Sequence, residues 1–168
     1  PITIRALANT AHCLTTTKQY DRAVPVCKLW LEQSRELHGM VHDNTVNAVC
    51  HLSLALNGSG CHQEAFEQLQ QLYDAQVEAH GVEHPEVHET ATKMAACLGS
   101  VGTEHALHRA LALLRPYTAG SDSTRQRSSQ LRRELRALHE REVRLAASQC
   151  DWSEAARLSK VMLQDEEQ

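Results

Sequence analysis

The sequence of residues 43–84 is DNTVNAVCHLSLALNGSGCHQEAFEQLQQLYDAQVEAHGVEH, and its pattern returns on both sides at an interval of 42 residues. The loop returns as well, because GMVH at residues 39–42 corresponds to GVEH at residues 81–84. Mostly apolar residues occupy corresponding places in three copies: Leu7, Val49 and Ala91; Cys13, Ala55 and Cys97; Leu14, Leu56 and Leu98. A long, fixed interval carried by apolar positions and a turn is typical of a repeat array.

Each repeat contains the pattern of two helices. Val49, Leu52 and Leu56 are three and four residues apart, a spacing that lines one side of an α-helix. Glycines follow this helix, and a second apolar stripe comes after them at Ala65, Phe66, Leu69 and Leu72. One antiparallel pair cannot bury both stripes, so neighbouring pairs must stack on each other. We therefore predict an all-α chain of stacked helix pairs.

Other positions of the repeat resemble a known family. The loop at residues 81–85 reads Gly-x-x-His-Pro, and the second repeat carries Gly60 followed by Glu64 and Ala65. The first repeat keeps Tyr20 and Ala23 but has Lys18 in place of the glycine, and the third keeps Gly102 and Ala106. This pattern resembles the tetratricopeptide repeat (TPR), in the 42-residue form of kinesin light chains. The resemblance implies a right-handed superhelical array of about four antiparallel helix pairs.

The period also predicts the domain organisation. Residues 1–115 are expected to form three TPR-like repeats, at about 1–42, 43–84 and 85–115. A loop is expected at residues 116–124, because proline, glycine and serines gather there. Residues 125–168 are expected to form a diverged fourth helix pair, with a long helix over 125–149 and a shorter one over 152–164. Such a pair would cap the C-terminal end of the array.

Composition narrows the class of protein. The net charge of −4 argues against a chain that binds nucleic acid electrostatically. No apolar run approaches the roughly 18 residues that a membrane span needs. The six cysteines show no CxxC spacing and mostly fall within expected helices, which favours reduced, largely buried thiols over a disulfide framework. We therefore expect an intracellular, cytoplasmic protein.

The resemblance implies a site on the inward face of the first helix of each pair, where the family holds extended peptides. The asparagine pair of kinesin light chains corresponds here to Ala8 and Asn9, Cys50 and His51, and Thr92 and Lys93, so only Asn9 keeps the family residue. The expected groove residues are Asn9, His12, Asn47, His51, Leu54, Glu89 and Lys93. Histidine and lysine suit an acidic ligand, although the same residues could simply be solvated.

The function expected from the resemblance is a non-enzymatic interaction module or scaffold that binds a peptide or partner helix in the groove. A structural subunit held permanently in a larger assembly is the alternative. No phosphate loop, GxSxG or HExxH motif occurs, so we predict neither catalytic residues nor a cofactor. No metal site is expected at His80, His84 and His88, because Gly81 and Pro85 interrupt any continuous helix between them.

A basic stretch gives a second candidate surface. Residues 125–144 hold seven arginines against three glutamates, a local charge of +4 in a chain of −4. This composition suits an acidic protein partner, anionic lipid or RNA, whereas a solvated helix face is the simpler reading. Aromatic residues for base stacking do not interleave with the arginines, so protein docking or solvation is favoured. The candidate residues are Arg125, Arg127, Arg132, Arg133 and Arg136.

Overall fold

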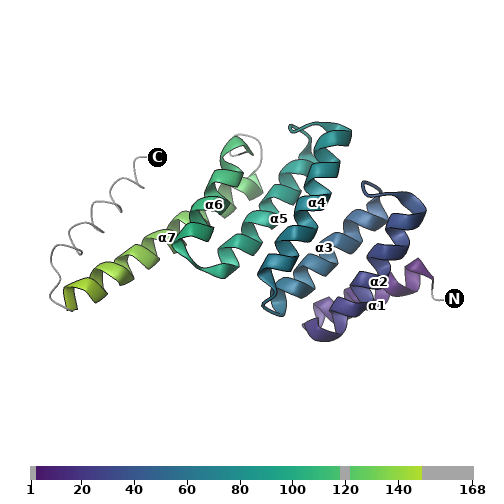
Figure 1. Ribbon diagram of the computed structural model, residues 1–168, viewed down its shortest axis with the longest axis horizontal. Helices are drawn as coiled ribbons and strands as arrows, with labels where there is room; N and C mark the ends of the chain where they lie inside the picture. The colour runs from purple at the N-terminus through teal and green to yellow at the C-terminus, as the bar shows by residue number, and fades with distance from the viewer. Residues whose placement is uncertain (1–2, 118–121, 149–168) are drawn as a thin grey trace. The chain divides into compact units, whose positions relative to one another are not determined.

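The computed structural model describes residues 3–117 and 122–148 (Figure 1). Throughout these residues the regular structure is helical, and no strand occurs among them. The elements are α1 (Ile4–Thr16), α2 (Tyr20–His38), α3 (Asp43–Gly58), α4 (His62–His80), α5 (Pro85–Val101), α6 (Glu104–Leu114), the short 3-10 helix η1 (Arg115–Tyr117) and α7 (Asp122–Ser148). The all-α prediction is confirmed.

The helices fall into two compact units. The first contains α1 to α5, and the second contains α6, η1 and α7, with the division between Val101 and Gly102. That division lies inside the third repeat expected from the sequence. None of the described helices is long and apolar enough to cross a membrane.

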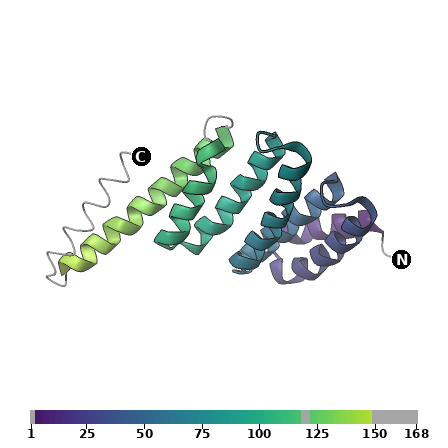
Figure 2. The ribbon, with the colours of Figure 1, turned by 45° about the horizontal axis from the view of Figure 1, so that its top comes forward.

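The first unit is built by packing each helix on the next one along the chain. Contacts join α1 with α2, α2 with α3, α3 with α4 and α4 with α5, and α1 also contacts α3 (Figures 1 and 2). Leu7, Val49 and Ala91 are each buried, at matching places on α1, α3 and α5. The 42-residue period therefore marks one structural position, as the sequence predicted.

Burial at the neighbouring positions depends on the helix that precedes each pair. Leu52 and Met94 are fully buried, because α3 packs on α2 and α5 packs on α4. Thr10, at the corresponding place on α1, is exposed. Burying a leucine side chain contributes about 2 kcal/mol, so this face supplies much of the stacking energy in the second and third repeats.

The turns within the pairs use one backbone conformation. Gly60 ends the α3 to α4 turn with a φ of 81°, and Gly102 has a φ of 69° at the matching place one period later. Lys18 stands one period before Gly60 and has a φ of 57°. A side chain in this left-handed region crowds its own backbone, which is why glycine is preferred there. The first repeat therefore keeps the turn while lacking the residue best suited to it.

A second glycine requirement comes from close packing of α2 against α3. A Cβ atom added to Gly58 would lie 2.5 Å from ring carbons of Tyr20. Any larger residue at position 58 would push the tyrosine ring away, so the approach of these two helices depends on Gly58. Next to this contact, the Ser59 hydroxyl donates a hydrogen bond of 3.1 Å to the carboxylate of Asp21.

At each loop between repeats, two histidine rings stack on each other. The rings of His38 and His42 are 4.3 Å apart, and those of His80 and His84, one period later, are 4.7 Å apart. Nδ1 of His42 accepts a hydrogen bond of 3.2 Å from the backbone N–H of Asn44, which caps α3. The recurring loop seen in the sequence is therefore a recurring side-chain arrangement.

In the second unit, α6 packs against α7. The described core residues are Ala106, Leu107, Ala110, Leu114, Ser128, Leu131 and His139. Helix α7 begins at Asp122, inside the segment expected to be a loop, and a carboxylate in the first turn of a helix is favoured by the helix dipole. The shorter helix expected at residues 152–164 lies outside the described residues.

The cysteines differ in part from expectation. None of the five that the structure describes forms a disulfide, and Cys27 and Cys97 are buried. Burial raises the pKa of the Cys27 thiol to about 11. However, Cys13 and Cys61 are exposed, so the prediction of largely buried thiols is wrong for them. Cys13 lies on α1, and Cys61 lies in the turn before α4.

We expect Lys18→Gly to stabilise the protein. The change relieves left-handed strain of roughly 1–2 kcal/mol, while the freer unfolded chain offsets part of the gain, leaving about 0.5–1 kcal/mol. Lys18 is exposed, so no packing is lost. Urea denaturation followed by circular dichroism measures the free energy of unfolding. Lys18→Ala is the control, because it keeps the strain; equal stabilisation by both variants would contradict the explanation.

Candidate functional site

The expected groove residues lie on three first helices of the first unit, and we call this set the first-helix face. Asn9 and His12 are on α1, Asn47, His51 and Leu54 on α3, and Glu89 and Lys93 on α5. Spacings of three and four residues keep the members from one helix on one side of it. Their side chains range from half-buried to exposed, and Leu54 is 51% exposed.

His51 lies at the centre of the described contacts. Its ring is 5.6 Å from that of His12 in an edge-on arrangement and 5.6 Å from that of Trp30. The His51 Nδ1 atom lies 3.2 Å from the hydroxyl oxygen of Thr15. That hydroxyl already donates its proton to backbone carbonyls of α1. We therefore assign the Nδ1–H tautomer to His51, which leaves Nε2 as a hydrogen-bond acceptor.

The surroundings keep His51 neutral. Burial lowers its pKa below the ordinary value, and the nearby charges of His12 and then Lys93 lower it further. Side chains from α1, α3 and α5 thus influence one ionisation equilibrium. The ring contact of His12 with His51 and the contact of Lys93 with Cys50 likewise join α1 to α3 and α3 to α5.

Lys93 supplies the positive charge of the face. Its Nζ atom lies 2.6 Å from Oε1 of Glu89 and 3.2 Å from the sulfur of Cys50. Burial, the largest single influence, lowers the pKa of Lys93, but Cys50 and Glu89 raise it and the net shift is upward. The ammonium is therefore charged at neutral pH. A ligand carboxylate that binds Lys93 must compete with Glu89, whose side chain is 68% exposed.

The structure brings some of the expected residues into contact and places others only by helical spacing. Direct contacts link His12 with His51 and Glu89 with Lys93. Asn9, Asn47 and Leu54 are exposed on the same helix sides. Sequence reasoning missed Thr15 and Trp30, which hold His51, and the contact of Cys50 with Lys93. The signal for Cys50 was present, since Lys93 lies one period and one residue after it.

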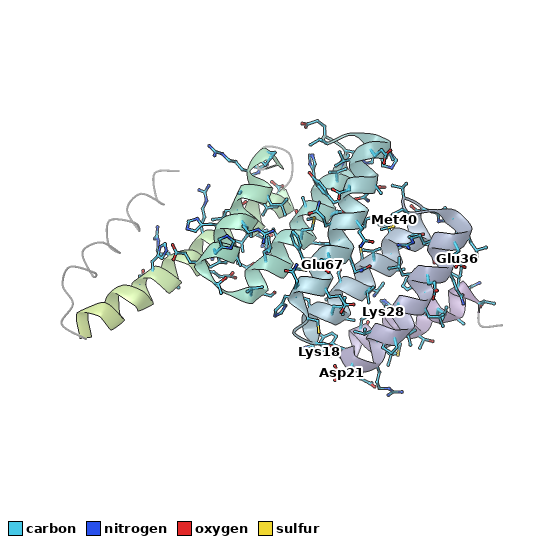
Figure 3. The ribbon with its side chains drawn as sticks, viewed as in Figure 1. Lys18, Asp21, Lys28, Glu36, Met40 and Glu67 are labelled. Carbon is cyan, nitrogen blue, oxygen red and sulfur yellow. The ribbon has the colours of Figure 1, made fainter. Side chains whose placement is uncertain are left out.

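The second helices carry charges of a different kind. Nζ of Lys28 on α2, labelled in Figure 3, lies 2.6 Å from Oε1 of Glu64 on α4. Both side chains are about half exposed, at 52% and 41%. Water screens such a pair, and it contributes at most about 1 kcal/mol. Lys28 is therefore a useful reference charge outside the first-helix face.

The five candidate arginines of α7 lie on more than one side of the helix. Arg125, Arg132 and Arg136 are seven and four residues apart, which places them on one stripe, and all three are exposed. Arg125 lies 3.0 Å from the carboxylate of Asp122. Arg127 is half-buried on the other side of the helix. Four of the five candidate arginines are thus exposed, Arg133 among them, and Arg127 is the half-buried one.

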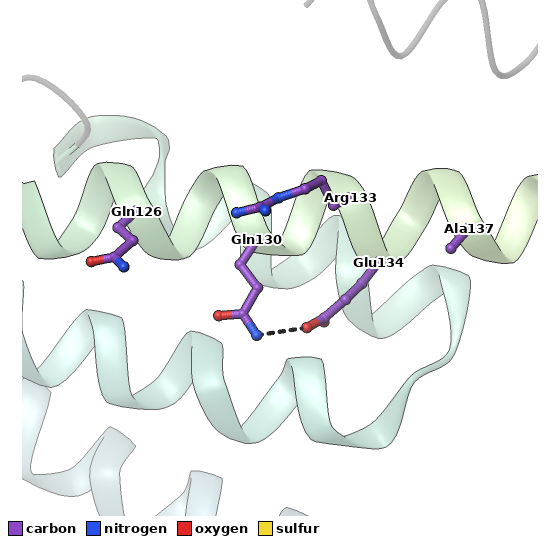
Figure 4. Close-up of a pocket in the computed structure, with 5 residues that line it drawn as sticks. All are labelled: Gln126, Gln130, Arg133, Glu134 and Ala137. Carbon is purple, nitrogen blue, oxygen red and sulfur yellow. Dashed lines mark hydrogen bonds between the residues drawn. The ribbon is translucent and has the colours of Figure 1, made fainter.

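Arg133 lies at an open depression along α7 (Figure 4). The depression has a volume of about 430 Å³ and is lined by Gln126, Gln130, Arg133, Glu134 and Ala137. Within it, Nε2 of Gln130 donates a hydrogen bond of 2.9 Å to Glu134. The described lining comes from one side of a single helix, so it offers a polar surface instead of an enclosed cavity.

Comparison with known proteins gives likeness at the level of the fold. No family model matches the sequence, and no curated protein matches it. Among solved structures, the nearly identical TPR-like repeats of a protein described as a kinesin light chain from Podosopora anserina superpose with a TM-score of 0.64 and 20% identity, over 98% of this chain and 89% of that one. A single-substitution variant of the same repeats superposes with a TM-score of 0.64 and 19% identity, over 98% of this chain and 88% of that one.

A third solved structure is more distant. BtubC (BKLC) from P. vanneervenii superposes with a TM-score of 0.56 and 15% identity, over 97% of this chain and 63% of that one. Sequence identities this low support a shared fold and nothing finer. The shared fold agrees with the helix pairs and the buried periodic positions described above. The chain has the fold of TPR-like helical repeats of the kinesin light chain kind.

Proposed function

We propose that this protein is a non-enzymatic interaction module that holds a peptide or partner helix across the first-helix face. The observation that carries the proposal is a set of contacts joining three successive first helices: the ring of His12 on α1 lies 5.6 Å from that of His51 on α3, and Nζ of Lys93 on α5 lies 3.2 Å from the sulfur of Cys50 on α3. A ligand lying across these helices would meet side chains from all three. Repeat proteins use such extended surfaces, built from equivalent positions of neighbouring units, to bind their partners.

The side chains indicate the chemistry of the ligand. Lys93 offers a positive charge, and Nε2 of His51 offers an acceptor to a ligand N–H. Leu54, one helical turn beyond His51, adds an exposed apolar contact. A peptide with an acidic residue near an apolar one fits this arrangement. Glu89 screens Lys93 until such a ligand arrives, which favours modest affinity and reversible binding.

We expect Lys93→Gln to weaken binding of an acidic peptide selected from a displayed library. Loss of one hydrogen bond to a charged group costs about 1.5–3 kcal/mol, or roughly a 10- to 100-fold rise in the dissociation constant. Fluorescence polarisation with a labelled peptide measures this value. Lys28→Gln is the matched control, because it removes the same charge from α2. Equal weakening by the two variants would show that general charge, and not the first-helix face, attracts the peptide.

We expect the opposite effect from Glu89→Gln. The change removes the carboxylate that competes for Lys93, so the same peptide should bind several-fold more tightly at low salt. Glu67→Gln on α4 provides the control for loss of one exposed negative charge. A tighter complex with both variants, or with neither, would rule out Glu89 as the competing group.

The stability of the fold should depend on pH through His51. Its folded-state pKa is lowered, so the unfolded chain takes up a proton more readily than the folded one. Stability is then fully present above the ordinary histidine pKa of about 6.5 and decreases as the pH falls below it. We expect His51→Gln to lose less stability than the parent between pH 7.5 and 5.5 in urea titrations. His105→Gln, an exposed substitution on α6, should behave like the parent.

A further inference from the structure

A cluster of metal-ligating side chains lies in the second unit and shares no residue with the first-helix face. Glu104 and His108 are four residues apart on α6, and His139 on α7 faces them. One ligand atom from each residue lies within 4.8 Å of the other two. Thr103 fixes the start of α6, because its hydroxyl accepts a hydrogen bond of 3.3 Å from the N–H of Ala106. The cap therefore also positions Glu104, the first residue of the helix.

Two of the three distances in the cluster are close to the edge length of a metal coordination polyhedron. Oε1 of Glu104 is 3.4 Å from Nε2 of His139 and 3.7 Å from Nε2 of His108. Ligands at about 2.0–2.1 Å from a tetrahedral zinc ion are about 3.3 Å from one another. A direct charge-assisted hydrogen bond would be shorter, about 2.7–2.9 Å.

Burial within the cluster is uneven in a way that suits a metal site. His139 is 1% exposed, whereas the side chains of Glu104 and His108 are each 45% exposed. The buried imidazole is thus oriented by the packing of α7 on α6, and the two partly exposed ligands leave an approach from solvent. With three protein ligands, a fourth position would be open to water.

We propose that Glu104, His108 and His139 form a site for a divalent transition metal of the zinc class that joins α6 to α7. Two imidazoles with one carboxylate favour zinc and its neighbours over magnesium or calcium, which prefer sets of oxygen ligands. The ion would link residues 31 positions apart in the sequence and stabilise the second unit by binding only its folded form. This site is independent of the proposed peptide binding.

The sequence alone indicates only part of this ligand set. Glu104 and His108 have the spacing of two ligands on one helix face, but His139 becomes their neighbour only through the packing of α6 on α7. His80, His84 and His88, where the sequence predicts no metal site, are not part of this set, and the rings of His80 and His84 stack on each other. Spacing along the chain therefore does not reveal a ligand set that forms between two helices.

Titration of the full chain with Zn²⁺ by calorimetry, under reducing conditions, tests the proposal. We expect one ion to bind, and Co²⁺ to give the visible absorption of a four-coordinate site with nitrogen and oxygen ligands. His108→Ala and Glu104→Gln should each weaken Zn²⁺ binding by roughly tenfold or more. Both positions are partly exposed, so the variants are expected to fold, and circular dichroism checks this. Mg²⁺ should not compete.

His105→Ala is the matched control, because His105 is an exposed histidine on the same helix outside the cluster. It should bind Zn²⁺ like the parent, and the ion should raise the melting temperature of the parent and of this control but not that of His108→Ala. Absence of Zn²⁺ binding to the parent would overturn the proposal. So would equal binding by the parent and His108→Ala, or cobalt bands from thiolate ligation, which would place the ion at the free cysteines.

Discussion

Stacking of helix pairs is the constraint on which the rest of the first unit depends. In an isolated helix pair, the apolar side of the first helix is exposed to water. Packing against the preceding pair buries that side. Leu52 and Met94 show the result, since both are buried in the stacked pairs, whereas Thr10 at the same place on α1 is exposed. A residue's exposure is therefore set by its place in the repeat and by whether a neighbour precedes it. The same kind of contact recurs between each pair and the next one along the chain.

The same stacking arranges the polar residues. Nζ of Lys93 contacts the sulfur of Cys50 at 3.2 Å, and Asn57 donates a hydrogen bond of 3.2 Å to Ser100; each pair is separated by 43 residues, close to one period. Thr15 reaches His51 across the preceding interface. Because equivalent positions of successive repeats lie side by side, each repeat contributes a different side chain to one surface. The chemical character of that surface can change by substitution while the buried period keeps the fold.

The parts of the structure encoded by the period could be predicted from the sequence. The bounds of α2, the start of α3 and the burial of Val49 follow from apolar spacing and glycine positions, which are local properties. Features that depend on contacts between different helices could not be obtained in this way. The support of His51 by Trp30 and the half-buried position of Arg127 are of this kind. The described residues contain no helix that repeats the sequence pattern of α7, so the 42-residue period could not be used to predict its contacts.

The turns show how a repeat tolerates an unsuitable residue. Lys18 adopts a φ of 57°, close to the conformations of Gly60 and Gly102 one and two periods later. The cost of roughly 1–2 kcal/mol for a left-handed side chain is comparable to the burial of a single leucine. Helix α3, which packs on α2 and α4, buries several apolar residues, among them Leu52 and Leu56. The packing therefore dictates the turn, and the local preference of Lys18 gives way.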